Sequence, residues 1–100
     1  MVGAARLQSD AAFEEAQRLS LQVVQLMATG KYFDAIPLAV KARDILEREL
    51  PESVGFAGSL KNLAELYRYT EQYEKAEPLY VRSLKVWRQM RREESYQYGL

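Results

Sequence analysis

The sequence predicts an all-α fold of four helices, paired into two antiparallel hairpins. Apolar residues recur three or four positions apart along most of the chain, which is the period of an amphipathic helix. The chain also repeats itself at an offset of 41 residues, so a two-helix unit occurs twice. The connections between the helical segments are only a few residues long, and such connections place consecutive helices side by side and antiparallel.

The first helix is expected over residues 10–29. Ser9 or Asp10 can cap its start by accepting a hydrogen bond from a free backbone N–H group of the first turn. Gly30 can end it, because glycine adopts the left-handed conformation without steric cost. The residues expected on its buried face are Phe13, Ala16, Leu19, Val23, Leu26 and Met27.

Three further helices are expected over residues 31–49, 53–70 and 72–93. The second of the four stops before Pro51, which cannot continue a helix, and Ser53 is a suitable cap for the third. Their apolar residues again recur at the helical spacing, as do those of the first helix. Residues beyond the fourth helix carry no clear pattern.

The internal repeat divides the chain into repeat one (residues 10–50), repeat two (residues 51–93) and a tail (residues 94–100), all within one domain. The segments Gly30–Leu46 and Glu71–Trp87 align without a gap and share five of seventeen residues. A proline recurs inside the second helix of each repeat, where we expect a local bend or an opened turn. The identical pairs are Tyr32 and Tyr73, Ala35 and Ala76, Pro37 and Pro78, Leu38 and Leu79, and Val40 and Val81.

These residues resemble the tetratricopeptide repeat family, in which Tyr-x-x-Ala opens the second helix of each pair. The resemblance covers about residues 17–92 and implies a short right-handed superhelical solenoid of stacked hairpins. The string NLAELYRYTEQYEKAEPLYVRSL is similar to the long-repeat subtype of kinesin light chains and many bacterial scaffold proteins. The residues at the family's large and small positions in repeat two are Leu60, Leu63, Ala64, Tyr67, Tyr73, Ala76, Tyr80 and Ser83.

The composition argues against catalysis and against cofactor or metal binding. The chain has no Cys and no His, which removes thiol nucleophiles, imidazole bases and most transition-metal sites. The formal net charge is zero, so neither a nucleic acid nor a membrane partner is expected, and a cytoplasmic location is the default. We interpret the basic residues of the last helix as cations that the helix dipole favours near a C-terminus, and not as contacts to nucleic-acid phosphates. These residues are Arg82, Lys85, Arg88, Arg91 and Arg92.

The resemblance implies that the first helix of each pair lines a concave surface that holds a protein or peptide partner. Asn62 matches the asparagine with which kinesin light chain-like repeats hold a peptide backbone. The alternative is that these polar residues only form a solvated face and bind no peptide. The implied groove residues are Gln17, Ser20, Val24 and Met27 from repeat one, and Lys61, Asn62, Glu65, Arg68 and Tyr69 from repeat two.

Two repeats are few for a solenoid, so both ends of the stack are expected to be partly apolar. The chain is then a piece of a longer array, or it self-associates as a homo-oligomer, or residues 96–100 fold back as a cap. The leading function is a binding module or scaffold that holds a peptide or helix, and the alternative is a structural self-assembly unit. The expected end-face residues are Val23, Leu26 and Met27 at one end, and Leu84, Trp87 and Met90 at the other.

Overall fold

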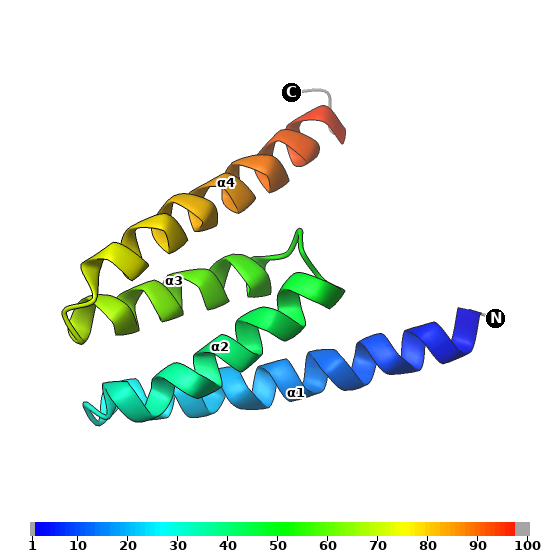
Figure 1. The fold of residues 1–100 in the computed structure, drawn as a ribbon. Helices are drawn as coiled ribbons and strands as arrows, with labels where there is room; N and C mark the ends of the chain where they lie inside the picture. Colours follow the sequence, from blue (N-terminus) through cyan, green and yellow to red (C-terminus); the bar gives the residue numbers. More distant parts are fainter. Residues whose placement is uncertain (1, 98–100) are drawn as a thin grey trace.

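Four helices build the chain: α1 (Val2–Ala28), α2 (Tyr32–Glu49), α3 (Val54–Tyr69) and α4 (Tyr73–Gln97) (Figure 1). The computed structural model describes the backbone of residues 2–97 and the side chains of residues 10–91. Each helix contacts the next one along the chain, so α1–α2 and α3–α4 form two hairpins joined between α2 and α3. No strand occurs in residues 2–97, and the all-α prediction is confirmed.

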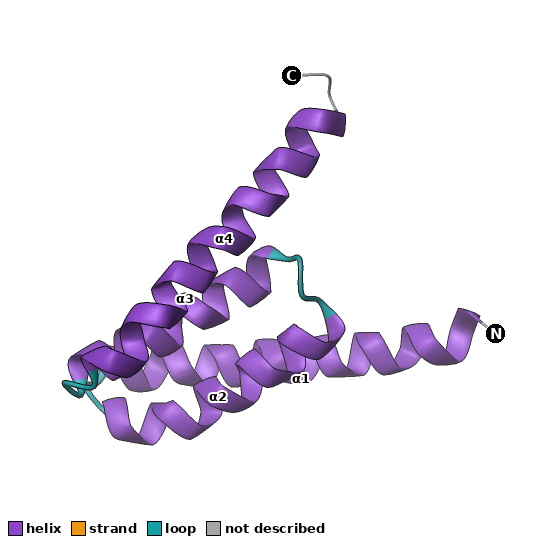
Figure 2. Ribbon diagram, turned by 45° about the horizontal axis from the view of Figure 1, so that its top comes forward, coloured by secondary structure: helices purple, strands orange, loops and turns teal. Residues whose placement is uncertain are grey.

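The two outer helices are longer than the sequence pattern predicts. Figure 2 shows that α1 and α4 run past the ends of the two inner helices. The expected cap at Ser9 or Asp10 is wrong, because both residues lie inside α1. Alanine, leucine and arginine dominate residues 4–7, and these residue types favour continuation of a helix. Residues 94–97 likewise belong to α4 rather than to a tail, and residues 98–100 lie outside the described part of the chain.

The turn inside each hairpin has the same geometry. Gly30 has a φ of 76° and ends α1 as predicted, with the Lys31 N–H donating to the Leu26 carbonyl at 2.8 Å. At the equivalent position of the second hairpin Glu71 has a φ of 61°, and the Gln72 N–H donates to the Tyr67 carbonyl at 2.7 Å. A left-handed residue with this hydrogen bond is a common helix ending, and it is favourable for glycine only.

The start of α3 and the two internal prolines are local features that the sequence also singled out. Ser53 caps α3 as predicted, because its hydroxyl oxygen accepts from the Phe56 N–H at 3.1 Å. Pro37 and Pro78 are each the sixth residue of their helix, and both side chains are exposed. The helical backbone is continuous at both, so the expected opened turn is absent. Water can reach the carbonyl that each proline leaves unpaired.

The core follows α2, which lies between α1 and α3. Small residues of α2 (Ala35, Ala39 and Ala42) are buried and let both neighbouring helices approach closely. The largest fully buried side chains come from α1 and α3, and Ile45 and Leu46 of α2 are buried as well. The buried Ser83 hydroxyl links α4 to α3 by donating to the Ala57 carbonyl at 2.9 Å. The largest fully buried side chains are Phe56, Leu60, Leu63, Leu66 and Val23.

Candidate functional site

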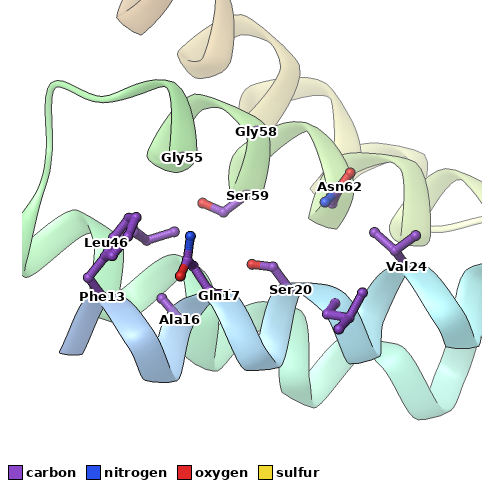
Figure 3. A pocket seen from close by; sticks show the side chains of 11 residues that line it. Phe13, Ala16, Gln17, Ser20, Val24, Leu46, Gly55, Gly58, Ser59 and Asn62 are labelled. Atoms are coloured by element: carbon purple, nitrogen blue, oxygen red, sulfur yellow. The ribbon is translucent and has the colours of Figure 1, made fainter. Parts of the chain in front are cut away.

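A groove with a volume of about 520 Å³ lies between α1 and α3, the first helices of the two hairpins (Figure 3). The first helix of each hairpin supplies one wall, while α2 contributes only Leu46 at one end. The residues that line the groove are Phe13, Ala16, Gln17, Ser20, Leu21, Val24, Leu46, Gly55, Gly58, Ser59 and Asn62.

The α1 wall of the groove is apolar and exposed. Phe13, Leu21 and Val24 all present substantial side-chain surface to solvent. Their spacing along α1 places them on one side of the helix, beside the buried positions that face α2. Exposed large apolar side chains gathered on a concave surface are typical of an interaction site.

The α3 wall projects little into the groove, because Gly55 and Gly58 have no side chains. A Cβ atom built at Gly58 meets no other atom within 4 Å, so the space above this residue is open. A Cβ atom at Gly55 makes ordinary contact with Leu46 at 3.7 Å. Neither glycine has a positive φ, so neither is required by the backbone. Both glycines therefore widen the groove, although each makes the α3 helix about 1 kcal/mol less stable than alanine would.

The polar groups of the groove are uncharged. Gln17 and Ser20 on α1 face Asn62 on α3 across the gap (Figure 3). The buried Ser59 hydroxyl donates to the Phe56 carbonyl at 2.7 Å and is already satisfied. No Asp, Glu, Lys or Arg side chain belongs to the lining of this groove. The side-chain amides of Gln17 and Asn62, which can both donate and accept hydrogen bonds, thus remain for a ligand.

Comparison with known proteins identifies the repeat. A model of the tetratricopeptide repeat family matches residues 19–89. The chain belongs to the tetratricopeptide repeat family. Comparisons with curated proteins and with solved structures each gave no match. Tetratricopeptide repeats generally mediate protein–protein interaction and are typically non-catalytic modules.

Four of the predicted groove residues come together in this tetratricopeptide groove: Gln17, Ser20, Val24 and Asn62. Met27 lies elsewhere, partly buried against the core. Tyr69 also lies outside the groove, where its ring stacks on Tyr32 at a centroid distance of 4.6 Å. The remaining predicted residues, which are absent from the lining and lie along α3, are Lys61, Glu65 and Arg68.

Several lining residues were not predicted. Phe13 was expected in the core, but it is exposed and stands at one end of the groove near Leu46. A stripe of apolar and small polar residues at helical spacing, from Phe13 through Gln17 to Val24, is the sequence signal that marks this wall. The two glycines of α3 gave no such signal, because their effect depends on where α1 lies.

The two end faces of the repeat stack differ, although both were expected to be partly apolar. Val23 is only 1% exposed, so its assignment to an end face is wrong. Leu26 and Met27 are also partly buried against the core, because this side of α1 points toward α2. At the other end Leu84 and Trp87 are exposed on α4, and Met90 is partly buried.

The basic residues of α4 have separate surroundings. Arg82 forms an ion pair with Glu47 of α2, and its guanidinium lies 5.2 Å from the Phe56 ring centre. Lys85, Arg88 and Arg91 are also exposed, while the Arg92 side chain lies outside the described residues. On α3, the pKa of the exposed Arg68 guanidinium is raised, chiefly by a hydrogen bond with the Tyr80 side chain.

The described residues show neither a metal-binding cluster nor a membrane-spanning helix. Within residues 10–91, the acidic side chains form no group of three that could hold a metal ion. None of the helices, over the part of the chain that is described, combines the length and the apolar character needed to cross a bilayer.

Proposed function

We propose that the chain is a non-catalytic interaction module that binds a peptide or helix of a partner protein in the groove between α1 and α3. The observation that carries this proposal is that the exposed apolar wall of α1 faces an uncharged α3 wall that contains Gly55 and Gly58. We further propose that the repeats belong to the long, kinesin light chain-like subtype. Their offset of 41 residues exceeds the ordinary unit of about 34 residues by roughly two helical turns.

The groove chemistry indicates which ligand segment it accepts. An apolar side chain that inserts between Phe13, Leu21 and Val24 gains about 1.5–3 kcal/mol from burial. The ligand backbone can approach closely at Gly58, where nothing from the chain itself fills the space. Gln17 and Asn62 can each pair with a backbone N–H or carbonyl group. A charged ligand side chain finds no counter-charge in the groove, so the preferred segment is uncharged and apolar at its centre.

The decisive experiment fills the groove without disturbing the core. A displayed library of random peptides is selected against the intact chain, and the affinity of the selected peptides is measured by isothermal titration calorimetry. Gly58→Leu places a side chain in the open space and removes a helix-destabilising glycine, so the variant folds and binding falls at least about tenfold. Asn62→Ala removes one hydrogen bond and weakens binding about fivefold.

The matched control is Gln22→Leu, which adds the same side chain to the flank of α1 turned away from the groove. Gln22 is exposed and borders a separate hollow with Leu26 and Leu38. This variant should bind the selected peptides as the parent does. Selection of no peptide, or unchanged affinity in Gly58→Leu, contradicts the proposal.

Self-assembly through the end faces has less support than groove binding. A head-to-tail stack needs an apolar patch at each end, and the α1 end offers polar residues. Gln22 and Gln25 are exposed there, and Lys41 of α2 pairs with Glu15 of α1 at 3.2 Å. The apolar residues of the α4 end therefore meet no matching apolar surface on a second copy stacked in this way.

A further inference from the structure

Within residues 2–97, no helix covers α4 in the way that α3 covers α2. In the first hairpin Tyr32 stacks on Tyr69 of α3, and Leu46 is 4% exposed in the core that it forms with α3 residues. The equivalent residues 41 positions later are Tyr73 and Trp87. These two side chains are 60% and 39% exposed. The side of α4 that corresponds to the α3-covered side of α2 is thus open.

The exposed residues Tyr73, Leu84 and Trp87 lie on one side of α4 together with the half-buried Tyr80. Tyr73, Tyr80, Leu84 and Trp87 follow one another at intervals of seven, four and three residues, which places them along one side of the helix. We call this surface, with Arg88 and Arg91, the α4 face. The opposite flank of the helix turns toward the first hairpin, where Arg82 and Gln89 contact Glu47 and Glu52.

The α4 face has a basic border. Arg88 and Arg91 are exposed, and each lies four residues after an apolar member of the face, Leu84 or Trp87. Arg68 of α3 adds a third cation: its guanidinium lies 4.7 Å from the Tyr69 ring centre and interacts with the Tyr80 side chain. Glu77 is acidic and lies on the same side of α4, between Tyr73 and Tyr80, whereas residues 78–91 contain no Asp or Glu. The positive charge therefore borders the C-terminal part of the face. A ligand on this surface therefore meets aromatic and aliphatic groups next to positive charge.

We propose that the α4 face binds an amphipathic helix of a partner protein whose apolar side is bordered by acidic side chains. We expect the partner segment to be a helix, because the corresponding side of α2 is covered by a helix, α3. Acidic borders complement Arg68, Arg88 and Arg91, whereas a second copy of the chain would bring the same cations against themselves. Tryptophan, tyrosine and arginine are also the residues that most often dominate interface energy. The surface is separate from the α1–α3 groove and does not depend on its function.

Trp87 makes the proposal directly measurable, since it is the only tryptophan of the chain. Two synthetic helical peptides serve as probes, with the same leucine side and either glutamate or lysine along both borders. The glutamate peptide should shift the Trp87 emission to shorter wavelength in a saturable titration, because the indole loses solvent. It should bind about tenfold more tightly than the lysine peptide at low salt, and added salt should reduce this ratio.

Variants on exposed positions test the surface while circular dichroism checks the fold. Leu84→Asp places a charge in the middle of the face and should abolish the emission shift. The double change Arg88→Glu and Arg91→Glu should reverse the preference between the two peptides. Arg48→Glu makes the same kind of charge change at an exposed site of α2 and should leave both affinities unchanged, as should Gly58→Leu in the groove.

Three results would overturn the proposal. The first is equal affinity of the two peptides for the parent chain. The second is an emission shift that survives in Leu84→Asp. The third is a parent chain that sediments as a dimer, becomes monomeric in Leu84→Asp and does not respond to the glutamate peptide, because a second copy then occupies the α4 face.

Discussion

Glu71 has a left-handed backbone conformation, which is more favourable for Gly30, the equivalent residue of the first hairpin. Gly30 and Glu71 both have positive φ and end the first helix of their hairpins. A residue with a Cβ atom costs about 1–2 kcal/mol in this region, because the side chain crowds the following carbonyl. The second turn thus holds strain that the first turn avoids.

Replacing Glu71 by glycine should stabilise the fold by about 1 kcal/mol. The strain of the left-handed residue is released, and part of the gain is lost to the greater freedom of glycine in the unfolded chain. The measurement is the midpoint of urea unfolding followed by circular dichroism. Gly30→Ala is the reciprocal variant and should lower stability by a similar amount. A lower midpoint for Glu71→Gly contradicts this account of the turn.

The contact between α3 and α4 depends on a buried polar residue. Ser83 is 5% exposed, and its hydroxyl donates to the Ala57 carbonyl of α3 at 2.9 Å. Alanine occupies the equivalent position of α2, where Ala42 is buried against its neighbours. A small side chain is required in both hairpins, and only the second one adds a hydrogen bond.

Ser83→Ala should therefore destabilise the chain by about 1 kcal/mol, the usual net contribution of one hydrogen bond. Ser20→Ala is the control, since the Ser20 hydroxyl lies in the groove and is partly exposed. Its loss should change the unfolding midpoint by less than about 0.5 kcal/mol. Equal effects of the two substitutions would show that the inter-helix hydrogen bond adds nothing.

At the scale of the elements, hydrophobic periodicity and turn residues were sufficient to predict four helices, the Gly30 ending and the Ser53 cap. The start of α1 was not predictable from a capping residue alone. Ser9 and Asp10 stand between runs of good helix formers, and helix propensity on both sides outweighs the local capping preference. Cap residues identify a helix start only where the preceding residues disfavour a helix.

Only part of the groove was predictable from the sequence. The resemblance to tetratricopeptide repeats implied which side of α1 and α3 faces the concave surface, so Gln17, Ser20, Val24 and Asn62 were expected there. Periodicity placed Phe13 in the core, although it lies at the border between the buried side of α1 and its groove side. The width of the groove at Gly58 depends on the distance between α1 and α3, and no local sequence pattern predicts that distance.

For the whole molecule, the two ends of the repeat stack have different chemistry. The α1 end presents Gln22, Gln25 and the Glu15–Lys41 ion pair, whereas the α4 end presents Leu84 and Trp87. We therefore expect a further helix to pack on the α4 end and not on the α1 end. The groove and the α4 face then provide two separate surfaces on a chain of 100 residues.

The central claim is that a partner peptide occupies the groove between α1 and α3. Two-dimensional ¹H–¹⁵N NMR tests it most directly, because backbone amides of glycine, the side-chain amide of asparagine and the tryptophan indole give well-separated signals. Addition of a peptide selected against the chain should shift the signals of Gly55, Gly58 and Asn62 and leave the Trp87 indole in place. Shifts at the Trp87 indole with an unchanged Gly58 signal would contradict the account.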